Sequence, residues 1–218
     1  MLKLYHYAPS PNSRRVWVAL LEKDLEFELV PIDLNGEQLQ PEFLAMNPFH
    51  HVPVLVDNGF KVVESLAILD YLDAKYPAPA LLPTNAEALA TVRMVELITV
   101  NELIPALSLL NRQWVGLGEN DSQKLEQAKQ QVATVLSVFE QLLGKQQYFG
   151  GEHLTLAEIV AGTALPSLPL LGISLSEHPQ LSDWVERLSQ RPAWAKTQLS
   201  LEEMEAVKSE IAARMAAS

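Results

Sequence analysis

A serine-containing turn near the N-terminus is the first segment whose residues could do chemistry. The sequence Ala8-Pro-Ser-Pro-Asn-Ser-Arg-Arg-Val16 joins a predicted strand to a predicted helix. The first turn of a helix presents unpaired backbone N–H groups and the positive end of the helix dipole, so an anion can bind there. The hydroxyl of Ser10 could add a hydrogen bond to that anion. The alternative is that Ser10 and Ser13 only cap the helix, because serine is a preferred N-cap residue.

The second segment contains a proline at the start of a strand. It reads Asn47-Pro-Phe-His-His-Val-Pro-Val-Leu55. A cis bond between Val52 and Pro53 would turn the Val52 backbone outward, leaving its N–H and C=O groups free to pair with an extended peptide. The sequence leaves both isomers open, and a trans proline would give this segment no special role.

The third segment is Glu64-Ser65, where a strand passes into a helix. As an N-cap, Ser65 would leave amide donors suited to a ligand carboxylate, while Glu64 could accept hydrogen bonds from a ligand ammonium group. The pair therefore fits the head group of an amino acid. The alternative is an ordinary helix cap beside a solvated acid.

Short predicted strands and helices alternate through the first 76 residues. These elements carry the three segments described above and determine where they lie. The order is βαβ, a connecting segment, then ββα, in which Asp57-Asn58-Gly59 marks a hairpin turn. A parallel crossover followed by an antiparallel hairpin predicts a four-stranded mixed sheet flanked by helices, the thioredoxin-like α/β arrangement. Pro31 places its strand at the sheet edge. The predicted strands are Leu2–Tyr7, Phe27–Asp33, Pro53–Val56 and Lys61–Val63, and the predicted helices are Ser13–Lys23, Pro41–Ala45 and Ser65–Tyr76.

The remainder of the chain has an all-helical pattern. A proline-rich stretch, Tyr76–Thr84, separates it from the first part, so we predict domains at 1–78 and 87–218 with a linker at 79–86. Pro105 predicts a kink near residues 101–105.

Further along the helical part, Thr155 and Glu158 form a capping box with a role in folding rather than in the active site. The longer predicted helices are Ala86–Trp114, Ser122–Leu143, Pro179–Gln190 and Leu201–Ala217.

Composition excludes several classes of function. The chain has no cysteine, so it has no disulfide, no thiol nucleophile and no cysteine-bound metal of its own. With 16 Lys and Arg against 27 Asp and Glu, the net charge of −11 argues against nucleic-acid binding. The N-terminus has no apolar run suited to a signal peptide or membrane span, so we expect a cytoplasmic protein with no membrane partner.

The ordered set of three segments resembles the glutathione-site motifs of the cytosolic glutathione transferases. The similarity is to the serine-type classes, such as theta, delta and tau, and covers essentially the whole chain. It implies attack by the thiolate of glutathione, as co-substrate, on a small hydrophobic electrophile, and it also admits a glutathione-dependent peroxidase activity. By the family's spacing Ser10 would stabilise the thiolate. Tyr7, at the end of the first strand, is the alternative because other classes use a tyrosine there.

The resemblance also implies the remaining contacts with glutathione. Val52, followed by Pro53, would pair with the cysteinyl backbone, and Glu64 and Ser65 would hold the γ-glutamyl head. The glycyl carboxylate would contact His50 and Gln38, although related classes often carry histidine in place of Gln38. His51 is expected on the surface, and the adjacent histidines have no third ligand for a metal.

A second substrate site is implied between the two domains. Its apolar wall would include Leu110 and Trp114, with Leu201 and Met204 as further apolar residues nearby. The family also implies a homodimer. A different class of function is a non-catalytic member of the same fold, acting as a ligand carrier or protein-interaction module, which would bind glutathione without turnover.

Overall fold

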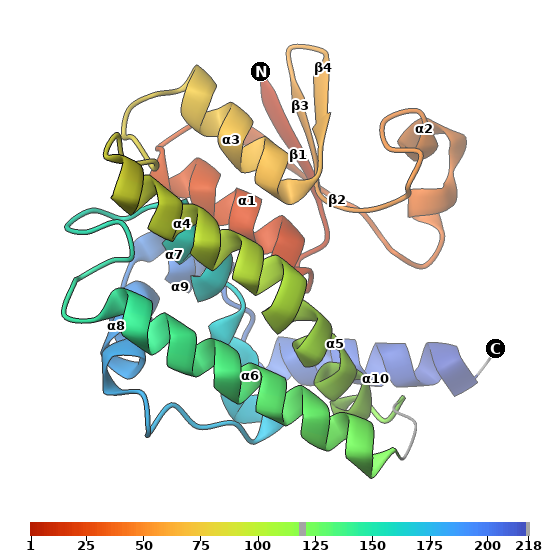
Figure 1. Ribbon diagram of the computed structural model, residues 1–218. Helices are drawn as coiled ribbons and strands as arrows, with labels where there is room; N and C mark the ends of the chain where they lie inside the picture. Colours follow the sequence, from red (N-terminus) through yellow and green to blue (C-terminus); the bar gives the residue numbers. More distant parts are fainter. Residues whose placement is uncertain (118–120, 217–218) are drawn as a thin grey trace. The chain divides into compact units, whose positions relative to one another are not determined.

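A four-stranded mixed sheet organises the first part of the chain. In the computed structural model, which describes residues 1–117 and 121–216, the strand order is β2-β1-β3-β4 (Figure 1). Strand β1 (Leu2–His6) pairs in parallel with β2 (Phe27–Pro31) and antiparallel with β3 (Val54–Asp57), which forms a hairpin with β4 (Phe60–Val63). The predicted mixed sheet is confirmed. Pro31 lies on the edge strand, where its missing N–H leaves no central ladder bond unmade.

Helices cover both faces of this sheet. Helices α1 (Pro11–Glu22) and α3 (Ser65–Lys75) contact each other on one face, and α2 (Pro41–Leu44) lies on the opposite side, after the 3₁₀ turn η1 (Glu37–Leu39) (Figure 1). Ser10 immediately precedes α1 and Ser65 is the first residue of α3, so both of these helices begin at the site described below. The apolar face of α1 is fully buried, through Val16, Val18, Ala19 and Leu20.

A short helix from late in the sequence belongs to this same unit. The chain divides into one unit of Met1–Leu81 with Pro192–Gln198 and another of Leu82–Arg191 with Leu199–Ser218. Helix α9 (Pro192–Thr197) contacts α1, and the Arg14 Nε–H donates to Thr197 Oγ1 over 3.3 Å. The predicted linker at residues 79–86 divides the chain once. It therefore does not account for α9, which follows the helical part in the sequence but belongs to the first unit.

The second unit is entirely helical. Its longest element runs from α4 (Ala86–Ile98) through a π-helical turn, η2 (Thr99–Leu103), into α5 (Ile104–Trp114). The irregularity expected near residues 101–105 is therefore found just before Pro105. The expected end of the last helix at Ala217 lies outside the described residues. The helices are α4 (Ala86–Ile98), α5 (Ile104–Trp114), α6 (Ser122–Leu143), α7 (Leu156–Gly162), the 3₁₀ helix η3 (Leu165–Leu171), α8 (Pro179–Ser189) and α10 (Leu201–Ala216).

The continuous helix Ala86–Trp114 is also apolar. By length and hydropathy alone it could cross a membrane. A core helix of a soluble protein has the same length and hydropathy, so these two properties do not distinguish a membrane span from a core helix. Val92, Val95 and Leu103 along it are fully buried within the helical unit. Met94 and Leu97 on the same helix are exposed, and 39% of its apolar window is buried.

A buried carboxylate joins several elements of the helical unit. Glu158, fully buried on α7, accepts hydrogen bonds from the N–H of Phe149 (2.7 Å) and of Thr155 (2.8 Å), from the Thr155 hydroxyl (2.6 Å) and from Trp184 Nε1 (3.4 Å). The predicted capping box is therefore present. Burial raises the pKa of Glu158, and the donated hydrogen bonds act in the opposite direction. This side chain ties α7 and α8 to the preceding turn.

We predict that Glu158→Ala strongly destabilises the protein. The change leaves four buried donors without their acceptor, so the expected loss is about 3 kcal/mol or more of the free energy of unfolding. Urea denaturation measures it. Glu126→Ala on the exposed face of α6 is the matched control, with an expected change within about 0.5 kcal/mol. Equal losses in the two variants would contradict the structural role assigned to Glu158.

Candidate active site

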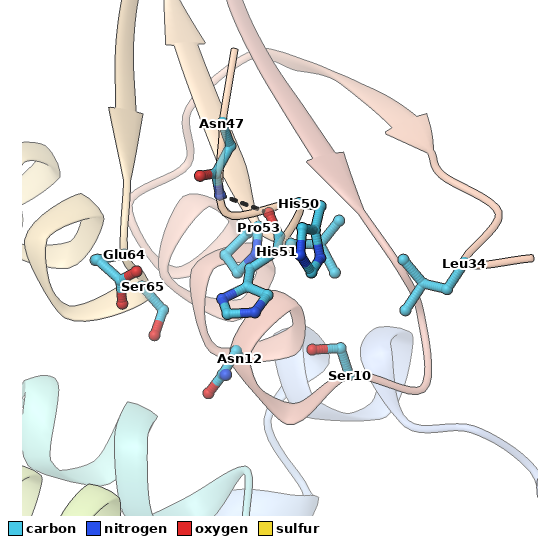
Figure 2. Close-up of a pocket in the computed structure, with 10 residues that line it drawn as sticks. Ser10, Asn12, Leu34, Asn47, His50, His51, Pro53, Glu64 and Ser65 are labelled. Carbon is cyan, nitrogen blue, oxygen red and sulfur yellow. Dashed lines mark hydrogen bonds between the residues drawn. The ribbon is translucent and has the colours of Figure 1, made fainter. Parts of the chain in front are cut away.

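All three chemistry-bearing segments meet at one cavity in the first unit. Its volume is about 300 Å³, and Ser10, His51 and Ser65 are arranged around the same space (Figure 2). A cavity of this size suits a small peptide or metabolite rather than a macromolecule. The lining residues are Ser10, Asn12, Leu34, Asn47, His50, His51, Val52, Pro53, Glu64 and Ser65.

Ser10 both caps α1 and faces this cavity. Its backbone is extended (φ −76°, ψ 119°), and its Oγ accepts a hydrogen bond from the Ser13 N–H over 3.3 Å. The two interpretations of Ser10 are therefore compatible. Because Oγ accepts from the helix, the hydroxyl proton is available for donation into the cavity. Pro11, at the first helical position, lacks an N–H and leaves this end of the helix open.

A buried cation lies one helical turn after Ser10. Arg14 is almost fully buried on α1, and burial lowers its pKa to about 10. A guanidinium with that pKa is still charged at neutral pH. Its Nε–H donates to Thr197 Oγ1, so the Arg14 side chain lies against α9, and Arg14 is not among the residues that line the cavity.

The second segment is held in shape by Asn47. This buried side chain donates from Nδ2 to the His51 carbonyl (2.8 Å) and accepts from the Phe49 N–H (3.1 Å), as the dashed line in Figure 2 shows for His51. The Val52–Pro53 peptide bond is cis. Within residues 1–117 and 121–216, no residue hydrogen-bonds to the Val52 backbone, so its N–H and C=O are available to an extended ligand.

The third segment differs in detail from the prediction. Glu64, not Ser65, occupies the N-cap position of α3, and Ser65 is the first helical residue. In the described part of the chain no side chain caps the first-turn amides of α3. These donors and the positive end of the dipole thus remain suited to a carboxylate. The Glu64 backbone has φ +66° and ψ 117°, a conformation that is strained for any residue except glycine.

Two residues expected at the site lie elsewhere. The Gln38 side chain folds back onto its own loop, donating to the Leu34 carbonyl (2.9 Å) and accepting from the Gly36 N–H (3.0 Å), and it is not one of the residues that line the cavity. Tyr7 packs against a core cluster around Phe43 and Val52 instead of lining the cavity. Local hydrogen bonding and apolar packing account for these placements.

Other residues of the site were not singled out from the sequence. Asn12, Leu34 and Asn47 line the cavity, and His51 does so while remaining exposed to solvent, as was expected for a surface residue. His50 lies beside His51, with the two rings 5.3 Å apart, and has a positive φ of 50°. For Asn47 the sequence offered one signal of a structural role. Asparagine often accepts a hydrogen bond from the backbone N–H two residues later, which here is that of Phe49.

A second cavity lies within the helical unit. Its volume is about 230 Å³, and it includes Leu110 and Trp114, the two residues predicted for the electrophile. Lys208 Nζ on α10 lies 4.5 Å from the centre of the Trp114 ring, at cation–π distance. Leu201 and Met204 do not line this cavity as the structure describes it. The lining residues are Leu110, Gln113, Trp114, Leu125, Lys129, Leu170 and Leu171.

Metal chemistry has no site among the residues that the structure describes. No group of three or more His, Asp or Glu side chains is close enough there to hold an ion. The adjacent His50 and His51 both line the cavity.

Comparisons with known proteins find similarity along both parts of the chain. The family model described as glutathione S-transferase, N-terminal domain, matches residues 4–80, and the one for the C-terminal domain matches residues 104–192. Glutathione S-transferase 3 of Zea mays is 38% identical over 90% of this chain and 92% of its own length. Maleylacetoacetate isomerase of Pseudomonas aeruginosa is 33% identical over 88% of this chain and 93% of its own. The crystal structure of a glutathione transferase homolog from Sulfitobacter with bound glutathione superposes with a TM-score of 0.77 at 25% identity, covering 90% of this chain and 96% of that one.

The strained backbone at Glu64 leads to a stability prediction that does not involve a ligand. Both Glu64→Gly and Glu64→Ala remove the carboxylate, but only glycine accepts a φ of +66° without steric conflict. We expect the glycine variant to be more stable by about 1 kcal/mol, equivalent to a melting temperature about 2–4 °C higher.

The same pair of substitutions at an ordinary helical position supplies the control. At Glu126, in the interior of α6, Glu126→Gly should be less stable than Glu126→Ala by about 0.5–1 kcal/mol. Calorimetric melting of the four variants measures both differences. A Glu64→Ala variant as stable as Glu64→Gly would show that the backbone at residue 64 is not strained.

Proposed function

This chain belongs to the glutathione S-transferase family, and we propose that the hydroxyl of Ser10 keeps the thiol of bound glutathione ionised. The chain is a glutathione transferase, so the nucleophile that the sequence lacks is supplied by its co-substrate. The observation that carries the proposal is the convergence of three polar segments on one cavity, with a hydroxyl donor beside the N-terminus of α1. This assignment makes the enzyme a serine-type transferase.

The energies of the available interactions are sufficient for this role. A free thiol with a pKa of about 8.5 is only a few per cent ionised at pH 7. Lowering that pKa by about two units requires about 2.7 kcal/mol. A hydrogen bond to an anion contributes about 1.5–3 kcal/mol, and a helix dipole about 0.3–1 kcal/mol. Ser10 and α1 together reach the required range.

The other residues of the cavity fit the rest of glutathione. The free backbone groups of Val52 would pair with the cysteinyl residue of the extended tripeptide. The ammonium of the γ-glutamyl head would bind Glu64, and its α-carboxylate would bind the Ser65 hydroxyl and the first-turn amides of α3. For the glycyl carboxylate we assign His50 and His51, which line the cavity, in place of Gln38.

The electrophile is proposed to contact Leu110 and Trp114. The apolar wall that these residues share with Leu125, Leu170 and Leu171 supports a small hydrophobic molecule as second substrate. The similarity to maleylacetoacetate isomerase supports the inclusion of activated alkenes, since a thiolate can add to such a bond and leave again. Detoxification and glutathione-dependent peroxide reduction would use the same thiolate.

We also propose that the protein is a cytoplasmic homodimer. Large apolar side chains are exposed in each unit, with Phe49 and Phe60 in the first and Met94 and Leu97 in the second. Exposed apolar groups of this size are typical of surfaces that a partner covers. The similarity to glutathione transferases of plants and bacteria supports a second copy of this chain as that partner.

Replacing Ser10 should raise the pKa of the bound thiol. In Ser10→Ala we expect an increase of about 1–2 units, because one hydrogen bond to the anion is lost, and a fall in kcat/KM at neutral pH of about 10–100-fold. The ultraviolet absorbance of enzyme-bound thiolate, followed against pH, measures the pKa directly. Tyr7→Phe should leave it unchanged, since Tyr7 packs in the core cluster.

The control must separate catalysis from helix capping. Ser13→Ala is unsuitable, because Ser13 is fully buried and its Oγ accepts from the Tyr7 N–H over 3.2 Å. Asn85 caps α4 in the same way as Ser10 caps α1, accepting from the Ala88 N–H over 2.9 Å. Asn85→Ala should lose similar stability, about 1 kcal/mol, with no change in the thiol pKa. An unchanged pKa in Ser10→Ala, or a raised one in Tyr7→Phe, would refute the assignment.

Replacing Trp114 tests the assignment of the electrophile. Loss of a large apolar contact in Trp114→Ala should raise KM for a hydrophobic electrophile about tenfold or more, with KM for glutathione unchanged. Leu201→Ala is the control, because Leu201 lies on α10 of the same unit but is 70% exposed and does not line the described cavity. The assignment fails if Trp114→Ala leaves the electrophile KM unchanged or alters both KM values equally.

A further inference from the structure

A buried arginine on α1 contacts the serine that begins α3. Arg15 is 1% exposed, and its Nη1–H donates to Ser65 Oγ over 3.3 Å. The two helices pack against each other, so this hydrogen bond connects the helix that carries Ser10 with the helix that carries Ser65. Ser65 itself is 8% exposed and lines the cavity. One serine hydroxyl thus touches both a buried cation and the ligand space.

The contact fixes the direction of hydrogen bonding at Ser65. A guanidinium has only donors, so Ser65 Oγ must be the acceptor in its bond with Arg15. The hydroxyl proton is consequently directed away from Arg15. Ser65 lines the cavity together with Glu64 (Figure 2), and the uncapped first-turn amides of α3 belong to the same turn. A hydroxyl arranged in this way is prepared to donate to an anion.

We propose that Arg15 is a positioning residue that holds the Ser65 hydroxyl as a donor to the α-carboxylate of the γ-glutamyl group. This inference rests on the proposed binding of glutathione at the cavity. Arg15 is buried and is not among the residues that line the cavity, so in this proposal it acts on the ligand through Ser65. Its charge polarises the serine O–H bond and strengthens the hydrogen bond to the carboxylate. The adjacent Leu66 has no polar side chain and contributes only its backbone N–H to the same group.

A purely structural role for Arg15 predicts a different result. If the side chain only fills space between α1 and α3, its replacement alters stability and weakens the binding of every ligand of the cavity alike. If it positions the Ser65 hydroxyl, the effect is confined to ligands that carry the γ-glutamyl α-carboxylate. The two roles are therefore separated by a pair of ligands that differ in that carboxylate alone.

The experiment compares glutathione with 4-aminobutanoyl-Cys-Gly, which lacks only the γ-glutamyl α-carboxylate. Calorimetric titration of the full chain measures both dissociation constants in wild type and Arg15→Met, a substitution of similar length without donors. We expect glutathione to bind about tenfold more weakly to the variant, and the analogue to change less than about twofold. An equal loss for the two ligands overturns the proposal.

A double variant and a conservative variant complete the test. In a Ser65→Ala background, Arg15→Met should weaken glutathione binding by no more than about twofold, because the residue through which it acts is gone. Additive losses overturn the proposal. Arg15→Lys retains a charged donor and should bind glutathione within about threefold of wild type. Should the methionine variant not fold, Arg15→Lys decides, since equal weakening of both ligands by tenfold or more contradicts positioning.

The failure of this inference can be told from failure of the proposed function. Wild-type protein that does not bind glutathione at all refutes the proposed site and the role of Arg15 together. Wild-type protein that binds glutathione more tightly than the analogue, with variants that do not distinguish the two ligands, refutes only the role of Arg15.

Discussion

The directions of two hydrogen bonds determine what this cavity can bind. Ser10 Oγ accepts from the Ser13 N–H, and Ser65 Oγ accepts from Arg15, so each hydroxyl has its own proton to give to a ligand. Each serine also stands at the N-terminus of a helix, where the dipole favours negative charge. Under the proposed function, the two anions are the thiolate beside α1 and a carboxylate beside α3.

The sheet brings these two helix ends together. Strands β1 and β4 run in the same direction, each antiparallel to β3, and both α1 and α3 begin after the end of one of them. The loop before β3 lies between these ends, where Asn47 holds its shape and leaves the Val52 backbone unpaired. Under the proposed function, this chain of net charge −11 binds an anionic tripeptide at a local site of backbone donors and serine hydroxyls.

Much of this arrangement could be predicted from the sequence because it rests on local signals. The βαβ and ββα order, the edge position of Pro31 and the capping box at Thr155 and Glu158 follow from periodicity and turn chemistry, and the structure confirms them. The approach of Ser10, Val52 and Glu64 to one cavity was expected only from the resemblance to glutathione transferases.

Contacts between residues far apart in the sequence were not predictable. Examples are the placement of α9 against α1 and the contact of Arg15 with Ser65, which depend on tertiary packing. The placement of the Gln38 side chain was not predictable either, because it makes its hydrogen bonds within its own loop.

Proton release on binding tests the central claim most directly. If the bound thiol has a pKa about two units below 8.5, glutathione binding at pH 7.5 should release about 0.8 proton per site. Calorimetric titration in buffers of different ionisation enthalpy measures this number. S-methylglutathione, which has no ionisable thiol, should release almost none. A release close to zero for glutathione, or the same release for both ligands, would contradict the account, because the protein would then bind the tripeptide without ionising its sulfur.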